Sequence, residues 1–272
     1  MISRFLVAGG DRRMALLANQ LVQRGFCVDT LCLCNGQNDS VEINKAQALL
    51  LPYPFSVEDG KIRTVSGDGV PLQTILEQLT PGTIIYHHGH TRGAGEERFR
   101  WRLYDSDPEL VLQNAVISAE GAVNALMQST EDAVVNLHCL VTGYGIFARA
   151  LTRMLLGIGA KVTVTARREE ALRLAQLDGA RTLSLSEIEE SNKNWDVVMN
   201  TVPAKILNPD VVSAFKPGCI LMELASKPGG FDVKPAEHDG KKFIALPGIP
   251  GKYAPLAAAK ALCDSVIRTL EE

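Results

Sequence analysis

The stretch Cys139-Leu140-Val141-Thr142-Gly143-Tyr144-Gly145-Ile146-Phe147-Ala148-Arg149-Ala150 decides the fold of this chain. An apolar run enters a turn with two glycines, and a helical pattern follows the turn. The pattern is G-x-G-x-x-A, the alanine-ended form of the dinucleotide-binding fingerprint. Gly143 permits the tight turn, Gly145 lets the backbone approach a pyrophosphate, and Ala148 keeps the helix close to the sheet. Amides at the helix start, together with the helix dipole, then predict an anion site.

The residues after this turn complete a β-α-β unit. The predicted helix ends at Gly157 and Gly159, and residues 161–165 form the next predicted strand. Strand, turn, helix and strand each have the length that the fingerprint requires, so the sequence predicts a dinucleotide site here. The predicted cofactor contacts in the turn are Gly143, Tyr144, Gly145, Ile146 and Phe147.

The end of the second strand of this unit indicates which dinucleotide binds. An NAD-specific site usually places Asp or Glu there, where it binds the ribose hydroxyls. Here the strand ends at Thr165-Ala166, and Arg167 and Arg168 follow. Because a 2′-phosphate attracts guanidinium groups and repels carboxylates, Ala166, Arg167 and Arg168 predict NADP rather than NAD. The alternative is that the two arginines only begin a surface helix.

Loops rich in Gly, Pro, Ser, Thr and Asn follow further predicted strands. They start near Asn200, Ala225 and Pro247. Because the carboxyl ends of parallel strands meet at one edge of a sheet, these loops together predict a cofactor rim. Their predicted cofactor contacts are Thr201, Val202, Pro203, Ala225, Ser226, Pro247 and Gly248.

The first half of the chain predicts a second β-α-β unit. Residues 5–8 form a buried strand that ends at Gly9-Gly10-Asp11-Arg12-Arg13, before a helix and a second strand at residues 26–33. Arg12 and Arg13 therefore stand where open α/β sheets bind ligands. Positive charges at a helix start interact unfavourably with the helix dipole, so these two arginines are expected to have a role other than stabilising the helix. A solvated helix start is the alternative.

Three weaker patterns predict helices. Residues 44–49 and the charged residues 93–103 are each expected to be helical. Ser118 is expected to cap a helix that runs to about residue 128, with Glu120 in its first turn.

The strand predicted at residues 83–86 is followed by His87, His88 and His90. Adjacent positions on an extended chain point to opposite faces, and no Cys, Asp or Glu stands among the three. We therefore expect a polar loop that faces a cleft, and we predict no metal site.

Composition limits the function classes. The chain has 272 residues, 46% of them hydrophobic and 22% charged, with a net charge of −3 and a pI of about 6.0. This balance argues against a basic nucleic-acid-binding surface, and no apolar run is long enough to span a bilayer. The six cysteines stand singly or as Cys32-x-Cys34, which is neither a redox pair nor half a zinc site. Reduced thiols in a cytoplasmic protein are therefore expected, with no nucleic-acid or membrane partner.

The order of these segments resembles a known family. The similarity extends over nearly the whole chain, and it is strongest from Asn114 to Ala259. The segments that carry it are N-A-V-I-S-A-E-G before the fingerprint, T-G-Y-G-I-F-A-R, T-A-R-R, N-T-V-P, L-A-S-K-P-G-G and L-P-G-I-P-G-K-Y-A-P, together with G-G-D-R-R and L-L-P-Y-P. They are similar to the A subunit of dipicolinate synthase. Ala148, in place of the usual third glycine, and the histidine loop depart from the pattern.

The resemblance implies a two-domain α/β protein with doubly wound parallel sheets. A flavodoxin-like substrate or catalytic domain is expected over residues 1–115, and a Rossmann dinucleotide-binding domain over residues 116–272. The last helix, at about residues 254–272, could pack on either domain. The resemblance also implies a partner, the flavoprotein-like B subunit of the synthase. We expect a homodimer because dimerisation through the cofactor domain is common in such folds.

The implied reaction is the oxidation of dihydrodipicolinate to dipicolinate during spore formation, with NADP as hydride acceptor. A small dicarboxylate substrate requires cationic partners, for which Arg12, Arg13, Lys227 and Lys252 are the candidates. Candidate catalytic residues are Arg12, Glu120 and His87, with His88 as a further proton acceptor. Two alternatives remain: a cofactor-binding regulatory or structural subunit whose partner performs the chemistry, and a similar dehydrogenase that acts on another small carboxylic acid.

Overall fold

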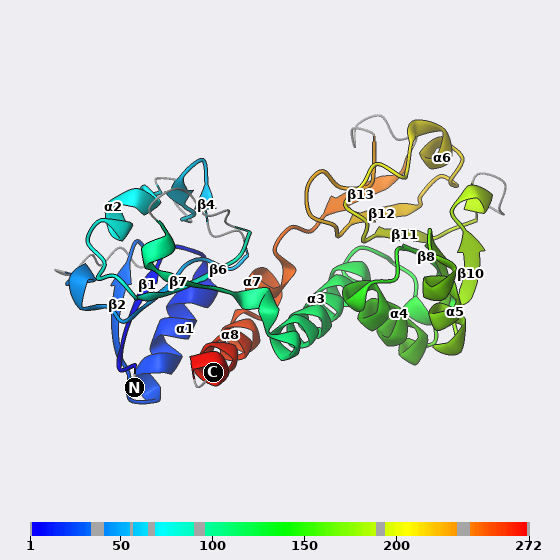
Figure 1. Ribbon diagram of the computed structural model, residues 1–272. Helices are drawn as coiled ribbons and strands as arrows, with labels where there is room; N and C mark the ends of the chain where they lie inside the picture. The colour runs from blue at the N-terminus through cyan, green and yellow to red at the C-terminus, as the bar shows by residue number, and fades with distance from the viewer. Residues whose placement is uncertain are drawn as a thin grey trace. The chain divides into compact units, whose positions relative to one another are not determined.

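The computed structural model describes residues 2–33, 41–54, 57–64, 69–89, 96–188, 194–232 and 240–270. The chain divides into two compact units (Figure 1). Unit 1 comprises Met1–Asn114 and Pro250–Glu272, and unit 2 comprises Ala115–Ile249. The chain thus leaves unit 1 once and returns to it at its end.

Unit 1 contains a five-stranded parallel sheet with the order β2-β1-β3-β6-β7. This is the flavodoxin-like strand order, so the predicted N-terminal fold is confirmed. Its strands are β1 (Arg4–Ala8), β2 (Cys27–Leu31), β3 (Ala48–Leu50), β6 (Ile84–His87) and β7 (Arg100–Leu103). A separate antiparallel pair consists of β4 (Val57–Glu58) and β5 (Lys61–Ile62).

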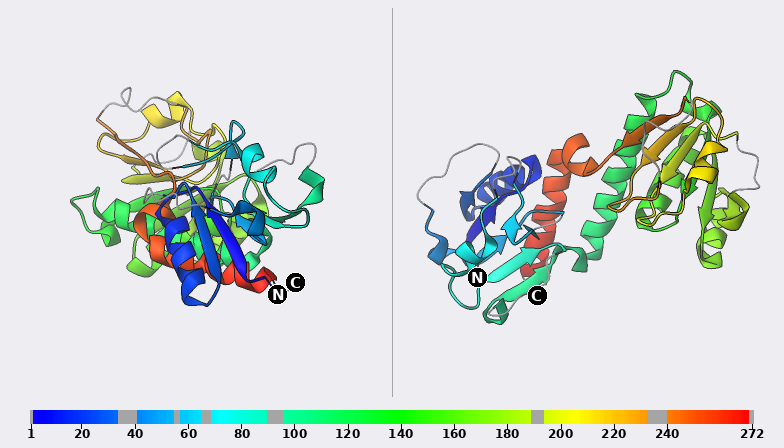
Figure 2. Two further views of the ribbon diagram at one scale, coloured as in Figure 1. Left: turned by 90° about the vertical axis from the view of Figure 1, so that its left-hand side faces the viewer. Right: turned by 90° about the horizontal axis from the view of Figure 1, so that it is seen from above.

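Helices cover both faces of the unit 1 sheet (Figure 2). Phe5 and Val7 of β1 pack on the face covered by α1 (Arg12–Gln23) and α8 (Pro255–Leu270). Leu6 and Ala8 pack on the opposite face with α2 (Leu72–Leu76). The alternation follows from the two-residue period of a strand, and burial on both faces explains its continuous apolar sequence.

The last helix, whose position the sequence left open, packs on unit 1. Helix α8 lies against α1, and an ion pair joins Arg24 at the end of α1 to Asp264 of α8. The hydroxyl groups of Tyr86 and Thr269 are hydrogen bonded at 2.8 Å, which ties α8 to β6 as well.

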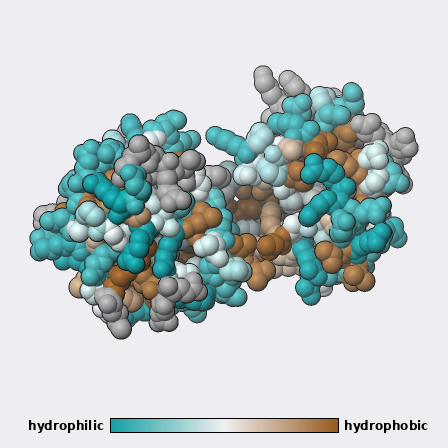
Figure 3. All heavy atoms as spheres, viewed as in Figure 1, coloured by the Kyte–Doolittle hydropathy of each residue, from teal (hydrophilic) through white to brown (hydrophobic). Residues whose placement is uncertain are grey.

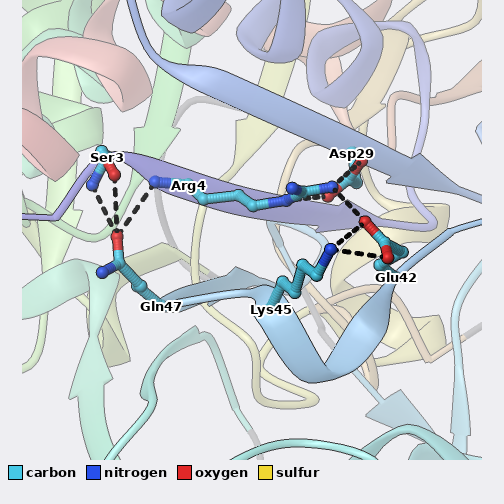
Figure 4. Close-up of polar contacts among 6 residues, drawn as sticks. All are labelled: Ser3, Arg4, Asp29, Glu42, Lys45 and Gln47. Carbon is cyan, nitrogen blue, oxygen red and sulfur yellow. Dashed lines mark hydrogen bonds and ion pairs between the residues drawn. The ribbon is translucent and has the colours of Figure 1, made fainter.

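Polar side chains stabilise the edge of this sheet where β1 begins (Figure 4). Gln47 Oε1 accepts hydrogen bonds from the backbone N–H groups of Ser3 and Arg4, at 2.7 and 3.2 Å. The Arg4 guanidinium donates to Asp29 at 2.7 Å and lies 3.5 Å from Glu42. These contacts join β1 to β2 and to the segment before β3.

Two of the helix predictions in unit 1 are wrong. Residues 44–49 contain η1 (Ile43–Lys45), and β3 begins at Ala48. The described part of 93–103 contains η2 (Glu96–Arg98) and β7. Residues 44–49 are misassigned because a short buried apolar run has no periodicity that separates strand from helix. Residues 93–103 are misassigned because β7 is an edge strand, whose arginines can reach solvent.

Unit 2 contains a six-stranded parallel sheet with the order β10-β9-β8-β11-β12-β13. In chain order this is 3-2-1-4-5-6, so the Rossmann prediction is confirmed. Its strands are β8 (His138–Thr142), β9 (Lys161–Ala166), β10 (Arg181–Ser184), β11 (Val197–Asn200), β12 (Ile220–Glu223) and β13 (Lys242–Ala245).

Side chains alternate between the two faces of this sheet too. Cys139 and Val141 of β8 pack with α4 (Ile146–Ile158) and α5 (Glu169–Leu177). Leu140 packs on the other face, which α6 (Pro209–Ser213) covers. The remaining short helices are η3 (Tyr104–Ser106), η4 (Val134–Asn136), η5 (Ser186–Ile188) and α7 (Ile249–Tyr253).

Helix α3 (Pro108–Met127) begins ten residues before the predicted Ser118 cap, so that prediction is wrong. Within the described residues, α3 alone is long and apolar enough to cross a membrane, but 44% of its apolar window is buried. Ala119, Ala122 and Leu126 belong to the core of unit 2, whereas Leu112, Val116 and Met127 are exposed. The face in Figure 3 shows hydrophobic residues in patches between hydrophilic ones.

Candidate dinucleotide and substrate sites

The glycine turn of the fingerprint lies between β8 and α4. Gly143 has a φ of +82°, and its N–H donates to the Thr165 carbonyl of β9 at 2.7 Å. A Cβ atom at this position would lie 2.8 Å from both Thr201 Oγ1 and Val202 Cγ2. The fold of the chain itself therefore requires glycine at position 143.

Gly145 differs from Gly143. It is the N-cap of α4 with a φ of −78°, which any residue can adopt. No heavy atom of the described residues, outside its chain neighbours, lies within 4 Å of the position that a Cβ would take. Protein packing therefore does not explain this glycine, whereas a phosphate group that approaches the first amides of α4 would explain it.

The other turn residues divide into structural and exposed groups. The Tyr144 hydroxyl donates to Asp178 Oδ2 at 2.7 Å, and Arg149 Nε donates to the same oxygen at 2.6 Å. The hydrogen bonds from Arg149 and Tyr144 lower the pKa of Asp178, whereas burial and Asp178 raise the pKa of Tyr144. The Tyr144 side chain thus anchors the turn to the end of α5, and Ile146 is exposed.

Arg167 and Arg168 directly follow Ala166, the last residue of β9, and both side chains are exposed. Arg168 is the N-cap of α5 without a side-chain capping bond. Among the described residues, no ion pair involves either guanidinium, so both charges remain available to a ligand. A carboxylate stands at Glu169, where it pairs with Arg173 at 3.1 Å.

A buried polar network joins the carboxyl ends of β8, β11 and β12. Thr142 Oγ1 donates to Asn200 Oδ1 at 2.6 Å, and Asn200 Nδ2 donates to Glu223 Oε1 at 2.6 Å and to the Val202 carbonyl at 2.9 Å. The Asn200 side chain is fully buried. Asn200 therefore fixes the loop of Thr201, Val202 and Pro203 beside the glycine turn.

The same network orders the loop after β12. Glu223 Oε1 accepts from the Ala225 N–H at 3.1 Å, and Oε2 accepts from the Gly230 N–H at 2.7 Å. A Cβ at Gly230 would lie 2.3 Å from Asn200 Nδ2, so only glycine fits there. Ser226 and Lys227 are exposed on this loop. Sequence reasoning missed Thr142 and Glu223, although both are polar residues at the ends of apolar strands.

The predicted rim residues after β13 lie at the unit boundary. Pro247 and Gly248 are both exposed and lead into α7. Gly248 has a φ of +68°, and no heavy atom of the described residues, outside its chain neighbours, lies within 4 Å of its Cβ position. As with Gly145, protein packing leaves space at this glycine.

In unit 1 the loops after β1 and β3 meet at the point where the strand order reverses. Cβ atoms at Gly9 and Gly10 would lie 3.3 and 3.4 Å from Pro52. Both glycines have positive φ, and the Gly10 N–H donates to the Arg63 carbonyl at 2.7 Å. Open α/β sheets bind ligands at this switch point, which makes it the candidate substrate site of unit 1.

The prediction that Arg13 binds substrate does not fit the structure. Arg13 is 3% exposed, and its Nη2 donates to Asp11 Oδ2 at 2.7 Å. Burial opposes ionisation of Asp11, but the bonds and charge of Arg13 outweigh it and lower the pKa of this carboxyl. A Cβ at Gly251 would lie 2.6 Å from Arg13 Nε. Arg13 is thus paired inside unit 1 beneath α7 and holds the loops together.

The remaining predicted cations are exposed. Arg12 is the first residue of α1, and Lys252 follows Gly251 in α7, so both lie in unit 1. Lys227 lies in unit 2. Glu120 is an exposed residue within α3, outside its first turn, and its catalytic role stays a prediction.

The histidines separate in space. His87 packs edge to face against Trp101, with ring centroids 5.4 Å apart, whereas His88 Nε2 lies 3.0 Å from Asp105 Oδ2. His90 lies outside the described residues. Within the described ranges, no three His, Cys, Asp or Glu side chains are grouped as metal ligands.

Comparison with known proteins agrees with this architecture. Residues 4–92 match the model of the N-terminal domain of the dipicolinate synthase A subunit. The A subunit of dipicolinate synthase from Bacillus subtilis (strain 168) is 27% identical over 290 aligned positions, which cover 99% of this chain and 96% of that protein. The chain is thus similar to dipicolinate synthase A subunits over nearly its whole length. The sequence-based resemblance is thus confirmed.

The family's solved structures share the whole fold. The crystal structure of the dipicolinate synthase A subunit from Bacillus halodurans has a TM-score of 0.86 and 25% identity, covering 99% of this chain and 98% of that one. A more distant relative is alanine dehydrogenase of Halomonas elongata, 28% identical over 229 positions that cover 66% of this chain and 61% of that protein. These relatives support an oxidoreductase-type role.

The two glycines of the turn make a matched pair of variants. We expect Gly145→Ala to fold with a stability within about 1 kcal/mol of the unmodified protein but to bind dinucleotide roughly tenfold more weakly, since the methyl group would occupy the phosphate approach. Gly143→Ala should lower the free energy of unfolding by about 1–2 kcal/mol or more, because of its positive φ and the contact with Thr201. Denaturant unfolding and dinucleotide titration measure both. Equal dinucleotide affinity in Gly145→Ala would contradict this assignment.

The Asn200 network predicts a pH-dependent variant. Asn200→Asp would place a second carboxylate at hydrogen-bond distance from Glu223, which raises the pKa of one of the two groups above its unfolded value. The folded state then binds more protons than the unfolded state, so stability should fall as the pH rises above about 4 and recover in acid. We expect a loss of about 3 kcal/mol at neutral pH in denaturant unfolding. Asn208→Asp, at a helix N-cap that accepts a carboxylate, is the control with little change.

Proposed function

We propose that this chain is an NADP-dependent oxidoreductase subunit that oxidises dihydrodipicolinate to dipicolinate. The observation that carries the proposal is the turn in unit 2, where position 145 has a glycine that packing among the described residues does not require and that the approach of a phosphate would explain. The turn opens a helix in a Rossmann sheet, and the similarity to dipicolinate synthase A subunits suggests the reaction.

Arg167 and Arg168 support NADP as the cofactor. They are exposed at the carboxyl end of β9, where a ribose 2′-phosphate would lie, and Asp or Glu is absent from residues 165–168. Guanidinium groups bind a phosphate with charge-assisted hydrogen bonds, whereas NAD offers them no such charge.

Unit 1 would hold the substrate. A bound nicotinamide would supply the hydride acceptor for the ring oxidation. Arg12 and Lys252, both exposed in unit 1, are cations that could pair with substrate carboxylates, and Lys227 of unit 2 is a further candidate. Glu120 and His87 remain candidates for proton transfer. The main task of the chain is to orient the donor carbon and accept one proton.

The biological setting follows from the family. We propose that the partner is a flavoprotein-like B subunit, that this chain forms a homodimer, and that it serves dipicolinate formation during sporulation. Cys27, Cys139, Cys219 and Cys263 are free thiols, which agrees with the cytoplasm as the proposed location.

A second candidate is a dehydrogenase for another small carboxylic acid. The 28% identity to alanine dehydrogenase of Halomonas elongata favours it, because that protein also matches most of this chain. The cations proposed for dipicolinate could equally bind a single carboxylate. The two candidates differ in substrate, so a direct assay separates them.

The cofactor choice is tested by titrating NADP and NAD into the purified chain. We expect tighter binding of NADP, and we expect Arg167→Glu to weaken NADP roughly tenfold or more with a smaller effect on NAD, since it repels the 2′-phosphate. Lys161→Glu makes the same charge change at the other end of β9 and is the control. Equal affinities for both cofactors in the unmodified protein would contradict the NADP assignment.

The reaction is tested by following the absorbance of reduced nicotinamide with dihydrodipicolinate, with and without a B subunit. We expect reduction of NADP in at least one arrangement. Activity of the chain alone would exclude a purely regulatory subunit. Reduction of NAD with alanine, and none with dihydrodipicolinate, would favour the second candidate and overturn the first.

A further inference from the structure

Three side chains of unit 1 form a compact hydrogen-bonded cluster. Asp105 Oδ1 accepts from the Tyr53 hydroxyl at 3.0 Å, and Asp105 Oδ2 lies 3.0 Å from His88 Nε2. Each carboxylate oxygen therefore has its own partner. The Tyr53 and His88 rings also pack edge to face, with centroids 5.1 Å apart.

The cluster is assembled from the carboxyl ends of three neighbouring strands. Tyr53 follows β3, His88 follows β6, and Asp105 lies in η3 directly after β7. The loop after β3 also contacts the turn after β1, so the cluster borders the switch point where such sheets bind ligands. Ligand chemistry at this edge would take place beside these three groups.

Aromatic packing holds the cluster rigid. The Tyr104 hydroxyl donates to the Leu51 carbonyl at 3.0 Å, and its ring lies against Tyr53 with centroids 5.5 Å apart. Tyr86 also packs on Tyr104, with ring centroids 5.6 Å apart. Fixed surroundings of this kind orient a catalytic side chain before substrate arrives.

The charges in the cluster favour an ionised Asp105. Burial opposes that ionisation, but the hydrogen bond and charge of His88 and the bond from Tyr53 outweigh it, so the pKa of Asp105 lies below its ordinary value. Burial and Asp105 raise the pKa of Tyr53, against a smaller opposite effect of Arg13, so Tyr53 stays a donor. The side chains of His88 and Asp105 are 20% and 35% exposed, which leaves both accessible.

We propose that His88, oriented by Asp105 and Tyr53, accepts the proton that substrate oxidation releases. The Asp105 carboxylate, 3.0 Å from Nε2, orients the imidazole ring. The inference rests on the proposed function, and it adds the proton acceptor that the glycine turn does not supply.

Formation of the new ring double bond removes two hydrogens from the dihydropyridine. One C–H bond breaks with its electron pair, which leaves as hydride for the oxidised nicotinamide. The neighbouring C–H bond leaves its pair in the ring, and its proton goes to the imidazole of His88. The resulting imidazolium is stabilised by Asp105 and later loses the proton to water.

The other candidates are less suited to this role. His87 packs against Trp101, and in an extended strand its side chain leaves the sheet on the opposite face from Tyr86. Glu120 is an exposed residue within α3. His88 has a carboxylate partner and stands at the carboxyl edge of the unit 1 sheet, beside the switch point.

The test compares His88→Ala, Asp105→Asn and Tyr53→Phe with the control His138→Ala, whose histidine begins β8 in unit 2. The assay uses the chain with its B subunit, dihydrodipicolinate and NADP. We expect kcat to fall about 10²-fold or more in His88→Ala, less in Asp105→Asn, and least in Tyr53→Phe. Added imidazole should restore part of the His88→Ala rate, and NADP affinity should stay unchanged in all four variants. The control should keep the kcat of the unmodified protein.

A second measurement does not depend on activity. Carboxyl NMR titration of the resting chain should show the pKa of Asp105 rising when His88 is replaced by Ala, because burial then lacks its main opposing contact. A kcat unaffected by His88→Ala, or a loss that imidazole does not restore, would overturn the proposal. An unmodified protein without nicotinamide-dependent oxidation would instead refute the proposed function, while the titration would still show whether the His88–Asp105 pair exists.

Discussion

The left-handed backbone at Gly143 is the constraint on which the nucleotide half of this protein depends. The turn brings the end of β8 directly beneath Thr201 and Val202, at distances that leave no room for a side chain. Gly143 also bonds to the Thr165 carbonyl at the end of β9. Three neighbouring strands thus end around one turn, and at the N-terminus of α4 no heavy atom of the described residues, outside the chain neighbours, lies within 4 Å of the Gly145 Cβ position.

Polar side chains at the strand ends make this arrangement specific. Asn200 is buried and bonds at once to Thr142, the Val202 backbone and Glu223. Buried polar groups are costly unless they are satisfied, so such a network admits a single arrangement of the loops. Glu223 orders the loop that contains Gly230 in the same way, because its Oε2 accepts a hydrogen bond from the Gly230 N–H. The loops of the candidate cofactor rim are therefore held in place by side chains at the strand ends.

In unit 1 an ion pair has a comparable role. Asp11 and Arg13 pair within the first turn of α1, and Gly251 of the returning chain packs directly on them. A methyl group at position 251 would disrupt the pair. The end of the chain, including α8, thereby becomes part of the N-terminal fold. Arg12, Lys252 and the His88 cluster remain as the candidate substrate-binding groups of unit 1.

The sequence by itself determined the two parallel sheets and the glycine turn, because both depend on local signals. Apolar runs of strand length and glycine spacing identify β1, β8 and β9 without tertiary information. The same local signals failed for β7, a short edge strand without a distinctive period, and for the start of α3.

Only the tertiary structure decided which side chains meet. Tyr53, His88 and Asp105 come from three separate loops, and their pairing depends on the strand order β3-β6-β7. Arg13 looked like a ligand-binding cation in the sequence, but folding buries it against Asp11. Local patterns record the preferences of one segment, whereas burial and pairing are set by segments far apart in the chain.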